Sequence, residues 1–445
     1  MKKTVDLRID AGWIVPVEPA GVVLQQHAIL VHEGRILALL PSDQADAGFD
    51  ATETVDLPGH VLFPGFVNAH THAAMSLLRG LADDLPLMDW LNRHIWPVES
   101  AFVSADFVRD GTRLAIAEML SGGTTCFNDM YFFPDVSAQV CEQAGMRAVV
   151  GLIVIDFPSA WAGDWRDYLR KGMALHESLR NSSLVSCAFA PHAPYSVSDE
   201  PLAEIARLSA ENGLPVHIHV HESEDELRSS VEQYGVRPLA RLDRLGLINE
   251  RLLAVHGCHL DDAEQTLLAQ KHAHVVHCPQ SNLKLASGFC PVAGLLDKGA
   301  HVALGTDGAA SNNDLDMLSE MRSAALLAKG VSGDPTTLPA HQALRMATLS
   351  GAEALGMADE TGSLTTGKWA DMAALDLHAL NTQPVYDPVS QLVYAAASQQ
   401  IQHVWVAGRP MLRHGELLSL DTDKVIGTAQ AWRARIAEHI AGNQT

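Results

Sequence analysis

The chain of 445 residues has few cysteines and no long apolar run, and each shortage narrows the class of protein. Its six cysteines form no C-x-x-C pair and mostly lie inside apolar runs, which predicts buried, reduced thiols. No apolar stretch approaches the ~20 residues that cross a bilayer, and the first residues lack the apolar block of a signal peptide. These shortages predict a cytoplasmic protein.

Basic residues are also scarce, since 31 Lys and Arg stand against 53 Asp and Glu. The resulting net charge of −22 repels phosphate backbones and anionic lipids, which excludes nucleic acid and membrane surfaces as expected partners. The hydrophobic content of 47% is enough for a large core. A chain of this length is expected to form one large domain and a smaller one.

Short β-rich runs alternate with helical segments through the middle of the chain. Helical spacing of apolar residues predicts helices over Ser104–Ser121, Glu200–Glu211 and Asp262–Gln270. Eight such alternations over about 250 residues predict an α/β fold with a (β/α)8 barrel. The eight predicted strands are Val61–Asn68, Thr124–Asn128, Ala148–Val154, Ser186–Ala190, Val216–Val220, Leu252–His256, His274–Cys278 and Val302–Gly305.

The two chain ends share a different, strand-like pattern and are expected to form one small β domain together. We therefore predict a barrel over residues 61–368, flanked by residues 1–60 and 369–445, which supply the small domain and a C-terminal helix. The helical segments Leu315–Ala328 and Pro339–Leu355 have apolar faces that suit either a homo-oligomer or packing on the barrel.

The pair His70-Thr71-His72 closes the first predicted barrel strand. Side chains at i and i+2 of a strand point to the same side, so both imidazoles can reach one divalent ion. Later strands end in His219 with Glu222, in His256 and in Asp307. Barrels of this kind build their active sites at the carboxyl ends of the strands, so these residues predict a catalytic metal site.

The identity of the metal stays open on chemistry alone. Imidazole and carboxylate donors suit Zn²⁺, but they also accept Fe²⁺ or Mn²⁺. The chain contains neither the H-E-x-x-H helix of zinc proteases nor the P-C-x-x-C ligands of cytidine-type zinc deaminases. Other histidines are expected to be bystanders: His217, His221, His259 and His301.

Five motifs resemble those of the amidohydrolase superfamily over essentially the whole chain: P-G-F-V-N-x-H-x-H, H-x-x-E, H-G-x-H, C-P-x-S-N and G-T-D-G. Further segments resemble the 5′-methylthioadenosine/S-adenosylhomocysteine deaminases within that superfamily. The resemblance implies a distorted (β/α)8 barrel with a β-sandwich built from both termini. The segments that resemble the deaminases are Leu87–Leu91, His94–Pro97 with Glu99, Pro191–Tyr195 and Ser311–Asp314.

The resemblance also implies roles for nine residues. It implies one metal, bound by His70, His72, His219 and Asp307, because Ala190–Pro194 offers no bridging lysine or glutamate for a second. By the same resemblance Glu222 delivers a proton to the purine ring, Asp307 relays the water proton to the departing ammonia, and His256 orients the attacking water. Glu99 and His192 would contact the ribose. Trp90 would either line the pocket or be an ordinary core tryptophan.

This resemblance predicts a zinc-dependent hydrolytic deaminase with a small-molecule nucleoside substrate. It would convert the 6-amino group of 5′-methylthioadenosine or S-adenosylhomocysteine, and more weakly of adenosine, to the 6-oxo form. The alternative is an amidohydrolase that deaminates or dechlorinates guanine, 8-oxoguanine or a triazine. A catalytically silent metal-binding scaffold is a further alternative, which the joint presence of Glu222, His256 and Asp307 disfavours.

Overall fold

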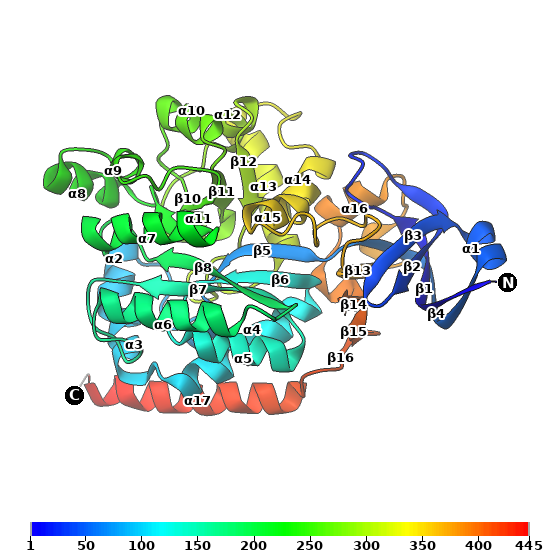
Figure 1. Cartoon of the computed structure of the whole chain (residues 1–445), viewed down its shortest axis with the longest axis horizontal. Coiled ribbons are helices and arrows are strands. Elements are labelled where there is room, and N and C mark those ends of the chain that lie inside the picture. The colour runs from blue at the N-terminus through cyan, green and yellow to red at the C-terminus, as the bar shows by residue number, and fades with distance from the viewer. Residues whose placement is uncertain (1, 444–445) are drawn as a thin grey trace. The chain divides into compact units, whose positions relative to one another are not determined.

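The computed structural model describes residues 2–443 and divides the chain into two compact units (Figure 1). The first unit comprises Met1–Asn68, Glu118–Cys126 and Asp316–Ser419, and the second comprises Ala69–Ala117, Phe127–Leu315 and Leu420–Thr445. Both ends of the chain contribute strands to the first unit, as the sequence predicts. Among the described residues, no helix is both long and apolar enough to span a membrane.

The first unit contains an eight-stranded mixed sheet in the order β16-β15-β14-β13-β4-β1-β2-β3. Its apolar core includes Ile9 and Ile29, both fully buried, with Trp405 at 2% exposure. Its strands are β1 (Lys3–Ile14), β2 (Leu24–His32), β3 (Arg35–Pro41), β4 (Phe49–Pro64), β13 (Met372–Asp376), β14 (Ile401–Val406), β15 (Arg409–Arg413) and β16 (Glu416–Leu417).

One predicted helix of the first unit is wrong in its extent. The segment Pro339–Leu355 forms two helices because Thr348 leaves the helical region, with φ −131° and ψ −92°, and its Oγ1 donates to the Leu344 carbonyl at 2.7 Å. The helices of this unit are α1 (Ser42–Gly48), α13 (Met317–Ser332), α14 (Ala340–Met346), α15 (Leu349–Ala354), η3 (Leu380–Thr382), α16 (Pro388–Tyr394) and η4 (Ser398–Gln400).

The predicted barrel is confirmed as a second eight-stranded sheet, with the order β12-β11-β10-β9-β8-β7-β6-β5. Its strands from β7 onward pair in parallel, and the two end strands approach closely because the Asp307 N–H donates to the His70 carbonyl at 3.0 Å. The strands are β5 (Phe66–Thr71), β6 (Thr124–Asp129), β7 (Arg147–Val154), β8 (Val185–Pro191), β9 (Val216–Val220), β10 (Leu252–His256), β11 (His274–His277) and β12 (His301–Leu304).

Local signals set the helices between these strands. Asp261 and Glu264 form a reciprocal capping box at the start of α10, and Gly213 ends α7 in the left-handed conformation with φ 69°. The helices are η1 (Ala73–Leu78), α2 (Leu87–Trp90), η2 (Leu91–Ile95), α3 (Trp96–Phe102), α4 (Ala105–Ser121), α5 (Pro134–Ala144), α6 (Trp165–Ser178), α7 (Asp199–Asn212), α8 (Glu224–Tyr234), α9 (Pro238–Arg244), α10 (Asp262–Gln270), α11 (Pro279–Lys284), α12 (Val292–Asp297) and α17 (Thr422–Asn443).

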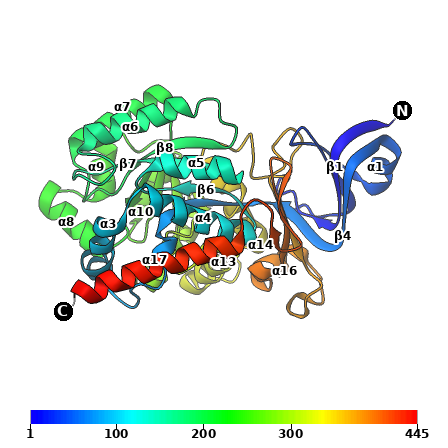
Figure 2. The same ribbon diagram turned by 90° about the horizontal axis from the view of Figure 1, so that it is seen from below.

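The long helix α17 packs along α4, as Figure 2 shows. The indole N–H of Trp432 donates to the Asp110 carboxylate at 3.0 Å, and the Trp432 ring meets Phe107 edge-on with centroids 5.3 Å apart. Since Trp90 belongs to the same apolar cluster as Trp432, this packing stabilises the segment that carries the predicted pocket residues.

The predicted strand Val61–Asn68 is wrong in one respect, because the structure divides it between the two sheets. β4 ends at Pro64 and β5 begins at Phe66, so Gly65 joins them. A Cβ atom at Gly65 would lie 2.1 Å from the Thr125 side chain, so only glycine fits this junction. The apolar run therefore serves both the small sheet and the first barrel strand.

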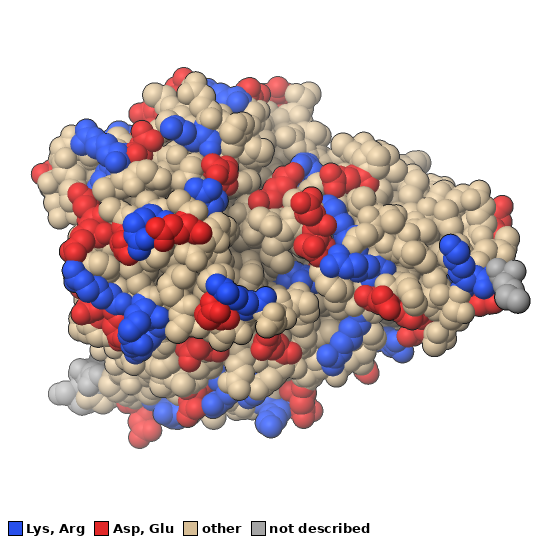
Figure 3. Space-filling view, viewed as in Figure 1, with Lys and Arg blue, Asp and Glu red and all other residues tan. Residues whose placement is uncertain are grey.

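Charged residues of both signs alternate on the face drawn in Figure 3. The acidic excess of the chain is therefore not gathered into one patch on this face. A large field of one sign, which would steer a charged macromolecule, is not seen there.

Candidate metal centre and active site

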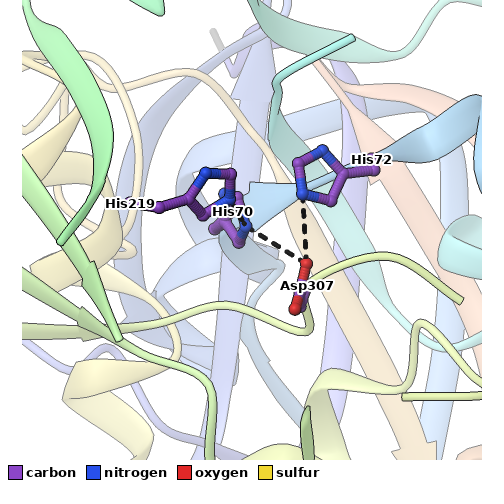
Figure 4. A group of neighbouring side chains, drawn as sticks. All are labelled: His70, His72, His219 and Asp307. Carbon is purple, nitrogen blue, oxygen red and sulfur yellow. Dashed lines mark hydrogen bonds and ion pairs between the residues drawn. The ribbon is translucent and has the colours of Figure 1, made fainter. Parts of the chain in front are cut away.

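Four predicted ligands converge at the carboxyl ends of the barrel strands. His70 lies in β5, His72 follows β5 directly, His219 lies in β9, and Asp307 follows β12. One ligand atom from each lies within 4.8 Å of the others (Figure 4). Such a cluster of three imidazoles and one carboxylate has the donor set of a catalytic metal site.

Two of the histidines are oriented by main-chain carbonyls. The Nδ1–H of His72 donates to the Met130 carbonyl at 2.6 Å, and that of His219 donates to the His192 carbonyl at 2.7 Å. In the neutral form each of these imidazoles carries its one proton on Nδ1, and its Nε2 then offers a lone pair to a metal. Both Nε2 atoms face the cluster, so this pair fits a metal.

The carboxylate of Asp307 is held from several sides. Oδ1 lies 3.2 Å from His70 Nε2 and 3.3 Å from His72 Nε2, whereas Oδ2 accepts from Ser281 Oγ at 2.6 Å and Ser311 Oγ at 2.9 Å. Asp307 itself adopts a left-handed conformation with φ 62°, which is uncommon outside glycine. Backbone strain of this kind is typical of functional sites.

The electrostatics favour an ionised Asp307 carboxylate and a neutral His70 imidazole. Burial raises the pKa of Asp307, but the neighbouring His70 and His72 lower it more, so its pKa lies well below its usual value. Burial lowers the pKa of His70 to about 4, against the opposing effect of Asp307. A neutral imidazole and an ionised carboxylate are the forms that bind a metal. The four donors and their burial therefore fit a divalent ion such as Zn²⁺.

Glu222 lies next to this cluster at 6% exposure. Its backbone N–H donates to Oε2 of Glu226 at 2.9 Å, and the His221 N–H donates to Oε1 of Glu226 at 3.0 Å. Glu226 thereby fixes the turn that presents Glu222. Burial raises the pKa of the Glu222 carboxyl, which favours the protonated form that a general acid needs.

His256 is oriented by an amide that sequence reasoning did not single out. Its Nδ1 lies 2.8 Å from Oδ1 of Asn282, which can only accept, so Nδ1 donates and Nε2 keeps its lone pair. Nε2 points toward Glu222, 3.8 Å from Oε1. The C-P-x-S-N motif therefore acts through α11, where Ser281 holds Asp307 and Asn282 holds His256. In the sequence, only this motif could have indicated that Ser281 and Asn282 belong to the site.

A cavity of about 690 Å³ opens above these groups. Its lining includes every predicted substrate residue: Glu99, His192, Trp90 and Glu222. Most of the remaining lining is apolar, and it contains no Lys or Arg among the residues that the structure describes. The size and apolar walls are typical of a small-molecule site.

The predicted ribose contacts are both oriented by neighbours. Tyr131 donates from its hydroxyl to Oε1 of Glu99 at 2.6 Å, which leaves Oε2 for a ligand. His192 Nδ1 lies 2.8 Å from Ser196 Oγ, which itself donates to the Ala193 carbonyl. His192 therefore donates from Nδ1, and its Nε2 can accept from a hydroxyl group. Burial lowers the pKa of His192 to about 3, so it stays neutral.

Of the four expected bystanders, one contacts a predicted ligand. His217 places Nε2 2.7 Å from Nδ1 of His70, whereas His221 and His259 contact main-chain carbonyls. His217 stands two residues before His219 on the same strand, and that spacing was the signal for it. The structure brings the predicted site residues together, and their roles in binding and catalysis stay predictions.

Comparisons with known proteins agree on one family. A model described as the amidohydrolase family matches residues 61–411. Two curated relatives, both 5-methylthioadenosine/S-adenosylhomocysteine deaminases, come from Teredinibacter turnerae and Saccharophagus degradans. The first is 46% identical over 433 residues, covering 97% of this chain and 98% of the relative. The second is 47% identical over 435 residues, covering 98% of each chain.

Comparison with solved structures finds zinc-bound enzymes of the same fold. A crystal structure of an adenosine deaminase from Xanthomonas campestris with bound zinc is 53% identical, with a TM-score of 0.98 over 98% of this chain and 100% of that one. An atrazine chlorohydrolase from Arthrobacter aurescens, complexed with zinc, has a TM-score of 0.90 at 22% identity, covering 96% and 99% of the two chains. The second likeness shows the fold alone.

Proposed function

Because this chain belongs to the amidohydrolase family, and within it to the 5-methylthioadenosine/S-adenosylhomocysteine deaminases, we propose that it is a zinc-dependent nucleoside deaminase. It would convert the 6-amino group of 5′-methylthioadenosine, and more slowly of S-adenosylhomocysteine and adenosine, to the 6-oxo form with release of ammonia. The observation that carries the proposal is the buried Glu222 beside the His70, His72, His219 and Asp307 cluster, at the floor of an apolar cavity.

Asp307 and Glu222 can perform the two proton transfers that the reaction requires. When bound, the metal acts as a Lewis acid and lowers the pKa of water from about 15.7 toward 7. Asp307 accepts one proton from the attacking water, while His256 Nε2 accepts a hydrogen bond from it and fixes its direction. Glu222 donates its proton to ring N1 as the C–O bond forms at C6.

Collapse of the tetrahedral intermediate restores both carboxyl groups to their starting forms. The C6 hydroxyl returns a proton to Glu222, and Asp307 gives its proton to the amino group, which leaves as ammonia. The product keeps the hydrogen on N1 and gains the 6-oxo group. Water and the nucleoside are therefore converted with no other reactant.

The proposal is tested by following deamination in the ultraviolet with zinc-loaded enzyme. The panel contains 5′-methylthioadenosine, S-adenosylhomocysteine, adenosine, adenine, guanine and 8-oxoguanine. We expect 5′-methylthioadenosine to react far faster than any free base. Turnover of guanine-type bases alone would be consistent with the metal-dependent mechanism but would refute the assignment of a nucleoside substrate.

We expect Glu99→Gln to lower kcat/KM for 5′-methylthioadenosine by roughly 10- to 100-fold. A hydrogen bond to a charged group contributes about 1.5–3 kcal/mol, and about 1.4 kcal/mol corresponds to a factor of ten. Slow turnover of free adenine should not change, because adenine has no ribose hydroxyls to bind Glu99. Equal losses on nucleoside and base would contradict the ribose contact.

We also expect the charge of the 5′ substituent to rank the substrates. The cavity holds carboxylates, Glu99 and Asp156 among them, and the described lining offers no Lys or Arg to pair with an anionic substituent. A purely anionic substituent, as in a 5′-(3-carboxypropyl)thio analogue, is destabilised by about 1.7 kcal/mol, or roughly tenfold, when its carboxylate lies about 10 Å from one of them at an effective dielectric constant of ~20. In S-adenosylhomocysteine the ammonium group offsets part of this repulsion, so kcat/KM should fall in the order 5′-methylthioadenosine, S-adenosylhomocysteine, anionic analogue.

Ionic strength separates this electrostatic effect from steric fit. Salt should raise kcat/KM for a 5′-(3-carboxypropyl)thio analogue and leave that for a neutral 5′-butylthio analogue unchanged, because salt screens charge but not shape. The same response for both analogues would contradict an electrostatic origin.

A cytoplasmic location is part of the proposal. All six cysteines are free and buried, which suits a reducing compartment. Cell fractionation tests it, and recovery of the protein outside the cytoplasm would refute it.

A further inference from the structure

His217 is a fully buried imidazole in the floor of the barrel. It lies in β9 two residues before His219, so both side chains point to the same side of the strand. Its Nε2 is 2.7 Å from Nδ1 of His70, and the two rings meet edge-on with centroids 4.8 Å apart. The strand β9 therefore supplies the predicted ligand His219 and also His217, which contacts the predicted ligand His70.

This contact spans the barrel interior. β5 and β9 are not neighbours in the sheet, since β6, β7 and β8 lie between them. The His70 ring is therefore fixed by a side chain from a distant strand. By contrast, the other two histidines of the cluster are fixed by carbonyls, which can only accept a hydrogen bond.

We propose that His217 is a positioning residue that sets the tautomer of the metal ligand His70. Nε2 of His70 faces the cluster, 3.2 Å from both Asp307 Oδ1 and His219 Nε2. A ring nitrogen binds a metal only through its lone pair, so His70 must carry its proton on Nδ1. Nε2 of His217 then accepts that proton's hydrogen bond, and His217 carries its own proton on Nδ1.

The fold gains little from this imidazole on its own account. Among the described residues, Nδ1 of His217 has no hydrogen-bond partner, and an unpaired buried polar group costs about 1–3 kcal/mol. An apolar side chain of similar volume would pack without that penalty. The hydrogen bond to His70 is the interaction at this position that requires an imidazole.

Zinc affinity of the full-length protein tests the proposal, which rests on the metal site of the proposed function. His217→Gln keeps an acceptor at about the reach of Nε2, whereas His217→Asn is too short and His217→Leu has no acceptor. We expect the Leu and Asn variants to weaken zinc binding by roughly 10- to 100-fold, and the Gln variant to stay within about threefold of the parent. Competition with a chromophoric chelator gives the dissociation constants.

A matched control separates the proposed contact from general packing. His274 is a buried histidine in β11 whose Nδ1 also lacks a partner among the described residues. We expect His274→Leu to leave the zinc dissociation constant unchanged. Unchanged affinity in His217→Leu, or equal losses in the Leu and Gln variants, would overturn the proposal.

Nitrogen NMR of the zinc-loaded parent protein covers the case in which a variant does not fold. With ¹⁵N-labelled histidine, the His217 signals are those that disappear in His217→Gln, or in His217→Asn where the Gln variant does not fold. We expect a protonated Nδ1 and an unprotonated Nε2, and a proton on Nε2 would overturn the inference. A parent protein that binds no zinc would instead refute the proposed function.

Discussion

Replacing Glu222 with Gln should lower kcat for 5′-methylthioadenosine by about 10²- to 10⁴-fold, the range for a positioned general acid. The amide keeps the shape of the carboxyl group but has no acidic proton to give to ring N1. Zinc content should stay at one ion per chain, because Glu222 is outside the four-residue ligand cluster. Steady-state kinetics and metal analysis on the same preparation check both expectations.

Glu224→Gln is the matched control for this substitution. Glu224 lies two residues further along the chain, at the exposed start of α8, and does not line the cavity. Its substitution makes the same change of carboxyl to amide on an exposed side chain and should leave kcat within about twofold. A comparable loss in both variants would show that the effect is not specific to Glu222 and would contradict the general-acid role.

A second substrate separates the two proton transfers. With a 6-chloropurine riboside, chloride leaves without a proton, so the relay from Asp307 to the leaving group is not needed. Protonation of N1 is still needed, and we expect Glu222→Gln to lose as much activity on this substrate as on the amine. If Glu222→Gln recovered activity on the chloropurine, Glu222 would instead be the residue that protonates the departing ammonia.

The barrel was predictable because each strand carries a local signature. β9 and β10 have the predicted bounds, since their apolar runs are short and flanked by turn residues. The junction at Gly65 was not predictable in this way. Its apolar run is continuous in sequence, and the break depends on the close approach of Thr125, which lies far along the chain.

The candidate site likewise has residues that the sequence identifies and contacts that only the structure reveals. Residues at strand ends, such as His219 and Asp307, could be named because barrel topology brings strand ends together. A motif marks Ser281 and a spacing marks His217, but the sequence does not give their partners, because each contact joins distant positions: Ser281 with Asp307 and His217 with His70. For His217, burial in an apolar strand predicted a bystander, and its partner was visible only in three dimensions.

Removing the metal should abolish deamination, with a loss of at least ~10³-fold, since Lewis-acid stabilisation contributes several kcal/mol. Dialysis against a chelator, followed by refilling with Zn²⁺, Fe²⁺ or Mn²⁺, should restore activity, whereas Mg²⁺ should not, because imidazole donors suit the former ions. Thermal unfolding should also shift downward, as a ligand at a thousand times its dissociation constant stabilises by about 4 kcal/mol. Full activity in demonstrably metal-free protein would refute the mechanism.

The same experiment carries a pH dependence with a defined sign. Burial lowers the pKa of His72, but the adjacent Asp307 raises it more, to about 9. The metal-free protein therefore holds a proton on His72 at neutral pH, and this proton must leave before Nε2 can bind a metal. Zinc affinity should accordingly rise about tenfold for each pH unit between 6 and 8, and calorimetry in buffers of different ionisation enthalpy should detect about one proton released per ion. Affinity that is flat over this range would show that His72 is already neutral, and would contradict the charge balance inferred for the His72–Asp307 pair.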